Sequence, residues 1–100
     1  MAGMKEMALG IASALRGGMG PNPLPVELWG YAPEDAAQLL TLIIDECADA
    51  GITLHEIRVD ATIVHQLTGS KTETGLSHRG TIIAVDGEVQ GRMDVYRQPL

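Results

Sequence analysis

The stretch APEDAAQLLTLIIDECADAGITLHEIRVD, residues 32–60, decides the fold because it joins the clearest helix of the chain to a strand. Pro33 suits the first turn of a helix, and the two carboxylates that follow it complement the positive end of the helix dipole. Apolar residues then recur at helical spacing until Gly51, which supplies a C-terminal stop. The pattern predicts a long helix over residues 33–50. Its buried stripe consists of Ala36, Leu39, Leu40, Ile43 and Cys47.

Strands are predicted on both sides of this helix. VELWGY, residues 26–31, is typical of a short strand, and ITLHEIRVD, residues 52–60, follows the helix directly. In residues 52–60 the apolar residues occupy even positions before His55–Glu56 and odd positions after it. Either a bulge lies there or Ile52 belongs to the preceding turn. Residues 26–59 therefore form a strand–helix–strand unit.

The C-terminal residues predict a short helix, a loop and two further strands. Asp60 is placed to cap a helix over ATIVHQLT, residues 61–68. GSKTETGLSHRG, residues 69–80, is polar and Gly-rich and predicts a long mobile loop. Asp86–Gly87 lies between two β-rich runs, which predicts a hairpin. Its last strand, residues 89–96, is expected to be half-exposed and to form an open edge of the sheet.

The N-terminal residues predict an amphipathic helical arm over 1–20. Gly-Pro-rich residues 17–25 form a linker to one α+β domain over 24–100. This domain is expected to hold a small mixed sheet of about four strands, with the long helix packed on it and a short second helix. The arm either packs on its own domain or docks on a neighbouring copy. Its apolar stripe consists of Met4, Met7, Ala8, Ile11 and Leu15.

The composition indicates a globular protein with an acidic surface. The net charge is −6, and 45% of the residues are hydrophobic, with no Phe, one Trp and two Tyr. An acidic chain with few aromatic side chains is poorly suited to bind nucleic acid, although a local patch of Arg58, Arg79, Arg92 and Arg97 stays open. Acidic residues lie close to these arginines in the sequence, which suggests that the arginines pair with carboxylates. The single Cys47 forms no internal disulfide, which favours a cytoplasmic protein, and no membrane segment is predicted.

Side chains that carry chemistry gather around Asp60, but their spacing matches no catalytic or metal-binding motif. His55 and Glu56 begin a zinc-protease-like pattern, yet the fourth position holds Val59 and the segment is a predicted strand. Ser70, Ser77 and His78 lack a nucleophile-elbow pattern. No catalytic residue, metal or cofactor is therefore expected. The alternative function is a small metal-dependent enzyme that uses His55, Glu56 and His65, or a weak nucleic-acid-binding module.

The order of motifs in the last half of the chain resembles small phage- or prophage-encoded α+β proteins. It runs GITLHEIRVDATIVHQL (51–67), a polar loop, RGTIIAVDG (79–87) and GRMDVYR (91–97). The resemblance transfers no functional residue, and it implies a virion-associated or assembly component without catalysis. We therefore expect a non-catalytic protein-interaction or assembly module that forms homo-oligomers. The residues expected to make the contacts are Met4, Met7, Ile11 and Leu15 in the arm, with Val95 and Tyr96 at the sheet edge.

Overall fold

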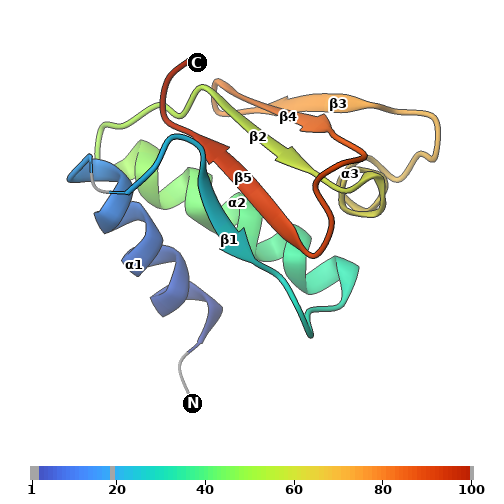
Figure 1. The fold of residues 1–100 in the computed structure, drawn as a ribbon, viewed down its shortest axis with the longest axis horizontal. Coiled ribbons are helices and arrows are strands. Elements are labelled where there is room, and N and C mark those ends of the chain that lie inside the picture. Colours follow the sequence, from blue (N-terminus) through green and yellow to red (C-terminus); the bar gives the residue numbers. More distant parts are fainter. Residues whose placement is uncertain (1–2, 19, 100) are drawn as a thin grey trace.

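One mixed sheet of five strands forms the frame of the structure, a computed structural model that describes residues 3–18 and 20–99 (Figure 1). The order of the strands across the sheet is β1-β5-β2-β4-β3. Only β2 and β4 run parallel, and the other neighbouring pairs are antiparallel. The predicted α+β class is confirmed, with five strands where about four were expected. The strands are β1 (Leu24–Glu27), β2 (Glu56–Val59), β3 (Gly75–His78), β4 (Thr81–Val85) and β5 (Arg92–Tyr96).

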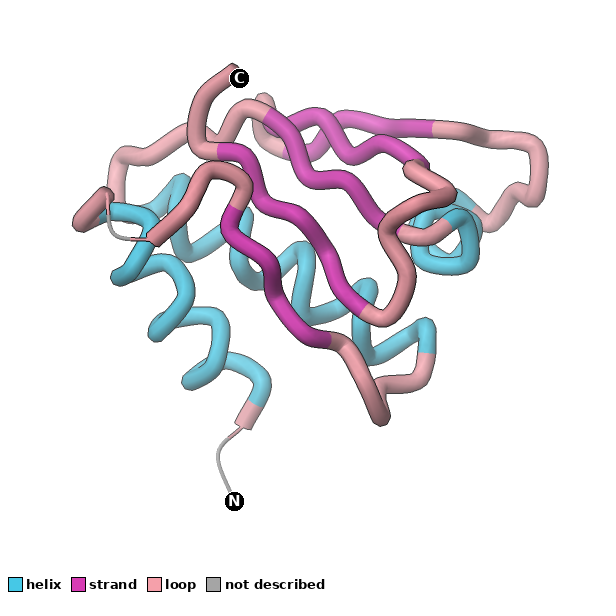
Figure 2. Tube along the Cα trace, in the orientation of Figure 1, coloured by secondary structure: helices cyan, strands magenta, loops and turns pink. Residues whose placement is uncertain are grey.

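Within the described residues, three helices complete the fold: α1 (Met4–Arg16), α2 (Pro33–Asp49) and α3 (Ala61–Thr68). The long helix α2 lies behind the sheet in the view of Figure 2, and α1 and α3 both pack against it. The predicted bounds of α2 and α3 agree with the structure. A side-chain oxygen of Asp60 accepts a hydrogen bond from the backbone N–H of Thr62 at 3.1 Å, so the predicted cap of α3 is also confirmed.

The hydrophobic core lies between α2 and the sheet. All five residues of the predicted stripe on α2 are buried, as helical spacing requires of a face that packs on a sheet. Strands contribute every second residue to this core because successive side chains point to opposite faces. The buried strand residues on this side of the sheet are Val26, Ile57, Val59, Ile83, Met93 and Val95, together with Thr81 at the start of β4.

The N-terminal arm is the helix α1, and it packs on α2 of the same chain. Ala8, Ala12 and Leu15 are buried in the common core, and Met4 and Ile11 are partly buried against it. The sequence left open whether the arm packs on its own domain or docks on a neighbouring copy. In the structure it packs on its own domain. Removing α1 would therefore expose part of the core.

The predicted hairpin at Asp86–Gly87 is wrong, and so is the predicted edge position of the last strand. β4 has β2 on one side and β3 on the other, which leaves no side on which β5 could pair. β5 is instead central, between β1 and β2, so Val95 and Tyr96 do not lie at an edge. The two edges are β1 and β3.

The predicted mobile loop over 69–80 contains a strand. Residues 75–78 form β3, which turns into β4 through Arg79 and Gly80. Both turn residues have positive φ, 48° for Arg79 and 86° for Gly80, as a two-residue hairpin requires. Arg79 is an unusual residue for this conformation, which explains why the sequence signals no hairpin here.

The predicted strand–helix–strand unit is split by β5. β1 and β2 both pair antiparallel with β5, so they run parallel to each other without being neighbours. β2 begins at Glu56, and therefore Ile52 belongs to the turn after α2. No helix of the described ranges is both long and apolar enough to span a bilayer.

Candidate interaction surface

The residues of the metal-dependent alternative are spread over different elements. His55 is exposed just before β2, Glu56 lies on β2, and His65 lies on α3. Among residues 3–18 and 20–99, no group of three or more His, Cys, Asp or Glu side chains is arranged to hold a metal ion. Nothing in the described geometry therefore favours the metal-dependent alternative.

The serines considered as nucleophiles do not face a histidine. Ser77 precedes His78 on β3, and neighbouring strand residues point to opposite faces of the sheet. The Ser70 hydroxyl lies 2.9 Å from the hydroxyl of Thr72. The imidazole of His78 is bound to a carboxylate of α2, so these side chains do not form a catalytic arrangement.

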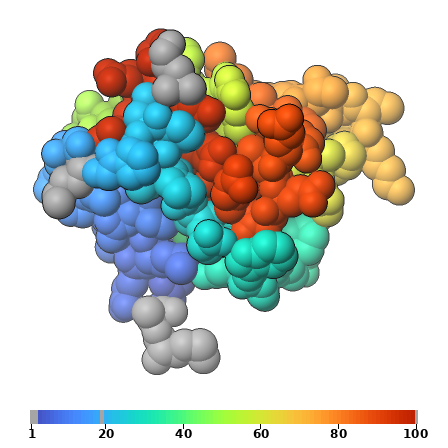
Figure 3. All heavy atoms as spheres, in the orientation of Figure 1, coloured from blue at the N-terminus to red at the C-terminus, as the bar shows by residue number. Residues whose placement is uncertain are grey.

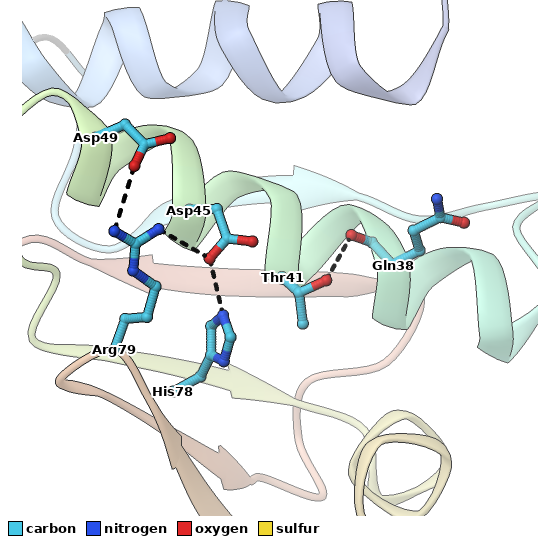
Figure 4. Close-up of polar contacts among 6 residues, drawn as sticks. All are labelled: Gln38, Thr41, Asp45, Asp49, His78 and Arg79. Carbon is cyan, nitrogen blue, oxygen red and sulfur yellow. Dashed lines mark hydrogen bonds and ion pairs between the residues drawn. The ribbon is translucent and has the colours of Figure 1, made fainter.

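A polar cluster fastens the β3–β4 hairpin to α2 (Figure 4). Nε2 of His78 lies 2.9 Å from Oδ1 of Asp45, and the guanidinium of Arg79 lies 3.3 Å from the same oxygen. The other terminal nitrogen of Arg79 lies 3.2 Å from Asp49. The hydrogen bond from His78 lowers the pKa of the Asp45 carboxyl below its ordinary value, and Arg79 lowers it further against the opposing effect of partial burial. The cluster thus fixes the position of the edge strand β3.

Sequence reasoning missed this cluster. Asp45 and Asp49 are four residues apart on α2, which places them on the same helix face. Their partners come 30 to 34 residues later, from the end of β3 and a turn without any indication in the sequence. The one indication of this cluster in the sequence was the i, i+4 pair of carboxylates near the C-terminal end of the helix. Carboxylates are unfavourable at this negative end of the helix dipole, so a cation is expected nearby.

The face of the sheet opposite α2 carries no helix of the described residues. Figure 3 shows this face, with the strands β1 and β5 toward the viewer. The residues that point to it are the alternate ones that stay out of the core. They are Pro25, Glu27, Glu56, Arg58, Ser77, Ile82, Ala84, Arg92, Asp94 and Tyr96. We call this set the open face.

Four of the five charged side chains in the open-face set pair with one another, and they are Glu56, Arg58, Arg92 and Asp94. Arg58 donates to Glu56 and lies 3.9 Å from Asp86, and its guanidinium stacks over the ring of Tyr96 at 4.8 Å. Arg92 donates to Asp94 at 3.1 Å. These pairs leave the face close to electrically balanced, in contrast to the net charge of −6 of the whole chain.

The four arginines of the possible basic patch are all engaged by acceptors. Arg58, Arg79 and Arg92 pair with carboxylates, and Arg97 donates to the carbonyl of Gly20 at 3.2 Å. A nucleic-acid-binding groove instead offers cations that are free to pair with phosphates. Three of the four arginines therefore pair with acids as expected, whereas the Arg97 guanidinium binds a backbone carbonyl.

The six residues expected to make contacts differ widely in exposure. Leu15 and Val95 lie in the core, and Tyr96 is buried beneath Arg58. Met4 and Ile11 are partly buried on α2. Met7 is 39% exposed, and its sulfur accepts a hydrogen bond from the Tyr31 hydroxyl.

Three large apolar side chains outside that set are more exposed than Met7, and one of them is Leu9 on α1, at 46%. Trp29, which follows β1, is 76% exposed, and Ile82 on the open face is 47% exposed. The Trp29 ring lies against Gly91, where an added Cβ would come within 2.5 Å of it. Ile82 stands beside Glu56 and Ser77 on the neighbouring strands. Such side chains are the ones that anchor protein contacts.

A groove between α1 and α2 has a volume of about 410 Å³. Leu9 and Arg16 line it from α1, and Glu46 and Asp49 line it from α2. It holds no imidazole or thiol, and the buried thiol of Cys47 has a pKa raised to about 11 by burial and by Glu46. Its polar lining consists of the Glu46 and Asp49 carboxylates, the Arg16 guanidinium and the Ser13 hydroxyl.

No protein-family model matches the sequence, and no curated protein or solved structure is significantly similar to it.

Proposed function

We propose that this protein is a non-catalytic interaction or assembly module that associates with copies of itself. The observation that carries the proposal is the open face, a sheet surface that no described helix covers. Four of its five charged groups, Glu56, Arg58, Arg92 and Asp94, are already paired with each other and are therefore not free to bind a substrate. Arg and Tyr, which are enriched in protein interfaces, stand at its centre.

The charge distribution supports a second copy as the partner. The whole chain is acidic, so two copies repel each other over most of their surface. On the open face, Arg58 and Arg92 offset the carboxylates beside them. Two copies can therefore approach most easily through the sheet. A virion or prophage assembly component is the specific role that the sequence resemblance implies.

The molar mass in solution tests this function. Light scattering and sedimentation equilibrium, from micromolar to near-millimolar protein, should give a mass above the 10.6 kDa of one chain. Ile82→Arg should lower that mass because it replaces an exposed apolar contact of the open face with a long, hydrated, charged side chain. Gln66→Arg, on the exposed side of α3, is the matched control and should leave the mass unchanged.

A monomer at every concentration would refute self-association. An oligomer whose mass is the same for both variants would show that the open face is not the contact surface.

A further inference from the structure

We infer that the edge strand β3 pairs antiparallel with β3 of a second copy, in one register, to join the two sheets. This inference deepens the proposed function and depends on its self-association. It names the edge and the pairing that start the assembly. Three features of the molecule support this pairing: the outward backbone groups of the two sheet edges, the symmetry of residues 75–77 and the charges that flank them.

The two edges of the sheet differ in their ability to accept another strand. Antiparallel pairing directs the backbone groups of alternate residues toward the neighbour and those of the others away from it. In β1, the hydrogen bond from the N–H of Leu28 to the carbonyl of Gly91 shows which residues bond to β5. The backbone groups of Pro25 and Glu27 therefore face outward, away from β5. Pro25 has no N–H to donate. The centre of the β1 edge is therefore blocked.

The β3 edge is open. The backbone N–H of Val85 donates to the carbonyl of Thr74, and the turn between β3 and β4 has two residues. These two facts determine which residues of β3 hydrogen-bond to β4, and they are Leu76 and His78. Gly75 and Ser77 face outward, and both have an N–H. Within the described ranges, no segment beyond the sheet ladder bonds to their backbone groups. Free edges of this kind are templates for another strand.

The outward residues are complementary to a second copy of themselves. If Leu76 lies on a two-fold axis, Gly75 pairs with Ser77 of the second copy and Ser77 pairs with its Gly75. Each pair exchanges two backbone hydrogen bonds. Gly75 has no side chain, and Ser77 has a small one, so neither obstructs the approach of the second copy on the open face.

Charge flanking the edge supports the same register. Antiparallel pairing about Leu76 brings Glu73, two residues before β3, toward the turn of the other copy, which begins with Arg79. Glu73 is exposed, and Arg79 is held in place by two carboxylates of α2. Opposite charges across strands stabilise the pairing and disfavour registers that separate them. An unrelated strand would lack this matched pair.

The strand is also held in position before pairing. His78 and Arg79 fasten the end of β3 to Asp45 of α2, so the edge loses little conformational freedom when it pairs. A four-residue edge buries a small area on its own. The association is therefore expected to be weak and to depend on concentration, with the exposed Ile82 beside Ser77 as an added contact.

A proline scan of the two edges tests the inference on the full chain. Ser77→Pro removes an outward N–H, and since each dimer loses two hydrogen bonds the dissociation constant should rise at least about tenfold. Glu27→Pro makes the same change at an outward position of the blocked edge and should leave the dissociation constant unchanged. Sedimentation equilibrium gives the constants, and circular dichroism confirms that both variants are folded.

A cysteine cross-link tests the register independently. Two Leu76 residues on the axis have Cα atoms about 4.5 Å apart, so Leu76→Cys should give a disulfide-linked dimer on mild oxidation. Thr74→Cys is the control, because the same register places two residues 74 about 13 Å apart. Cys47 is buried and does not interfere.

The outcomes separate this inference from the proposed function. Self-association that Ser77→Pro leaves unchanged would overturn the edge pairing and leave the open face as the contact surface. Weaker association without a Leu76→Cys cross-link would overturn the register and the pairing with a second copy. A wild-type chain that is monomeric at every concentration would overturn both, and would leave the β3 edge to a strand of a different protein.

Discussion

Replacing Asp45 by Ala should destabilise the fold by about 1 kcal/mol, because it releases the β3–β4 hairpin from α2. Asp45 makes two contacts, at 2.9 Å with His78 and at 3.3 Å with Arg79. The three side chains are between 35% and 44% exposed, so each contact belongs with screened surface pairs of about 0.2–1 kcal/mol. Two such contacts give the stated total.

Asp49→Ala is the matched control on the same face of α2. Asp49 makes one contact with Arg79 and is 65% exposed, so the lost pair is worth about 0.3 kcal/mol. Asp49 also lies in the last turn of α2, where a carboxylate costs about as much against the helix dipole. The two effects oppose each other, and we expect a net change near zero.

The stabilisation from Asp45 should depend on pH in one direction. Because the pKa of Asp45 is lower in the folded than in the unfolded chain, its contribution is complete above the unfolded pKa of about 3.9. It is lost as the pH falls through the folded pKa. The stability difference between the wild type and Asp45→Ala should therefore shrink below about pH 4.

Urea unfolding followed by circular dichroism measures these differences at neutral and acidic pH. An Asp45→Ala variant within about 0.3 kcal/mol of the wild type at neutral pH would refute the reasoning. So would an Asp49→Ala variant that loses as much stability as Asp45→Ala, because exposure would then not determine the strength of the contacts.

Three further changes test other parts of the fold. Asp60→Ala should cost about 1 kcal/mol in urea unfolding through loss of the α3 cap, and an unchanged midpoint would show that the cap contributes nothing. Cys47, whose pKa is raised to about 11, should resist thiol reagents at pH 8 until the chain unfolds; reaction in the native state would mean that the core opens locally. Gly91→Ala should displace the ring of Trp29 and strain a backbone with φ of 71°, which costs about 1–3 kcal/mol. The fluorescence of Trp29, the single tryptophan, should shift, and an unshifted spectrum would contradict the close contact.

Local signals in the sequence were sufficient for the helices. Apolar spacing placed α2, and Asp60 marked the start of α3, because both depend on residues within one or two turns. The slip at His55–Glu56 likewise marked the start of β2. These features could be predicted since their causes lie within the segments themselves.

Strand pairing could not be predicted in the same way. Asp86–Gly87 has the composition of a hairpin turn, but β4 is already paired on both sides, so tertiary packing overrides the local signal. The hairpin that does form turns through Arg79, a residue that rarely takes positive φ. The cluster at Asp45 depends on that turn and was hidden for the same reason.

The central position of β5 means that this one strand joins β1 to the rest of the sheet. β1 pairs with β5 alone, and β2 meets β1 only through it. Contacts of β5 with β1 join residues about 70 positions apart in a chain of 100, which slows folding because distant residues must meet first. Until residues 92–96 have been synthesised, β1 has no strand to join and the apolar side of α2 has an incomplete cover. A nascent chain that stalls before this segment would expose apolar side chains and unpaired strands. We expect such a chain to need a chaperone.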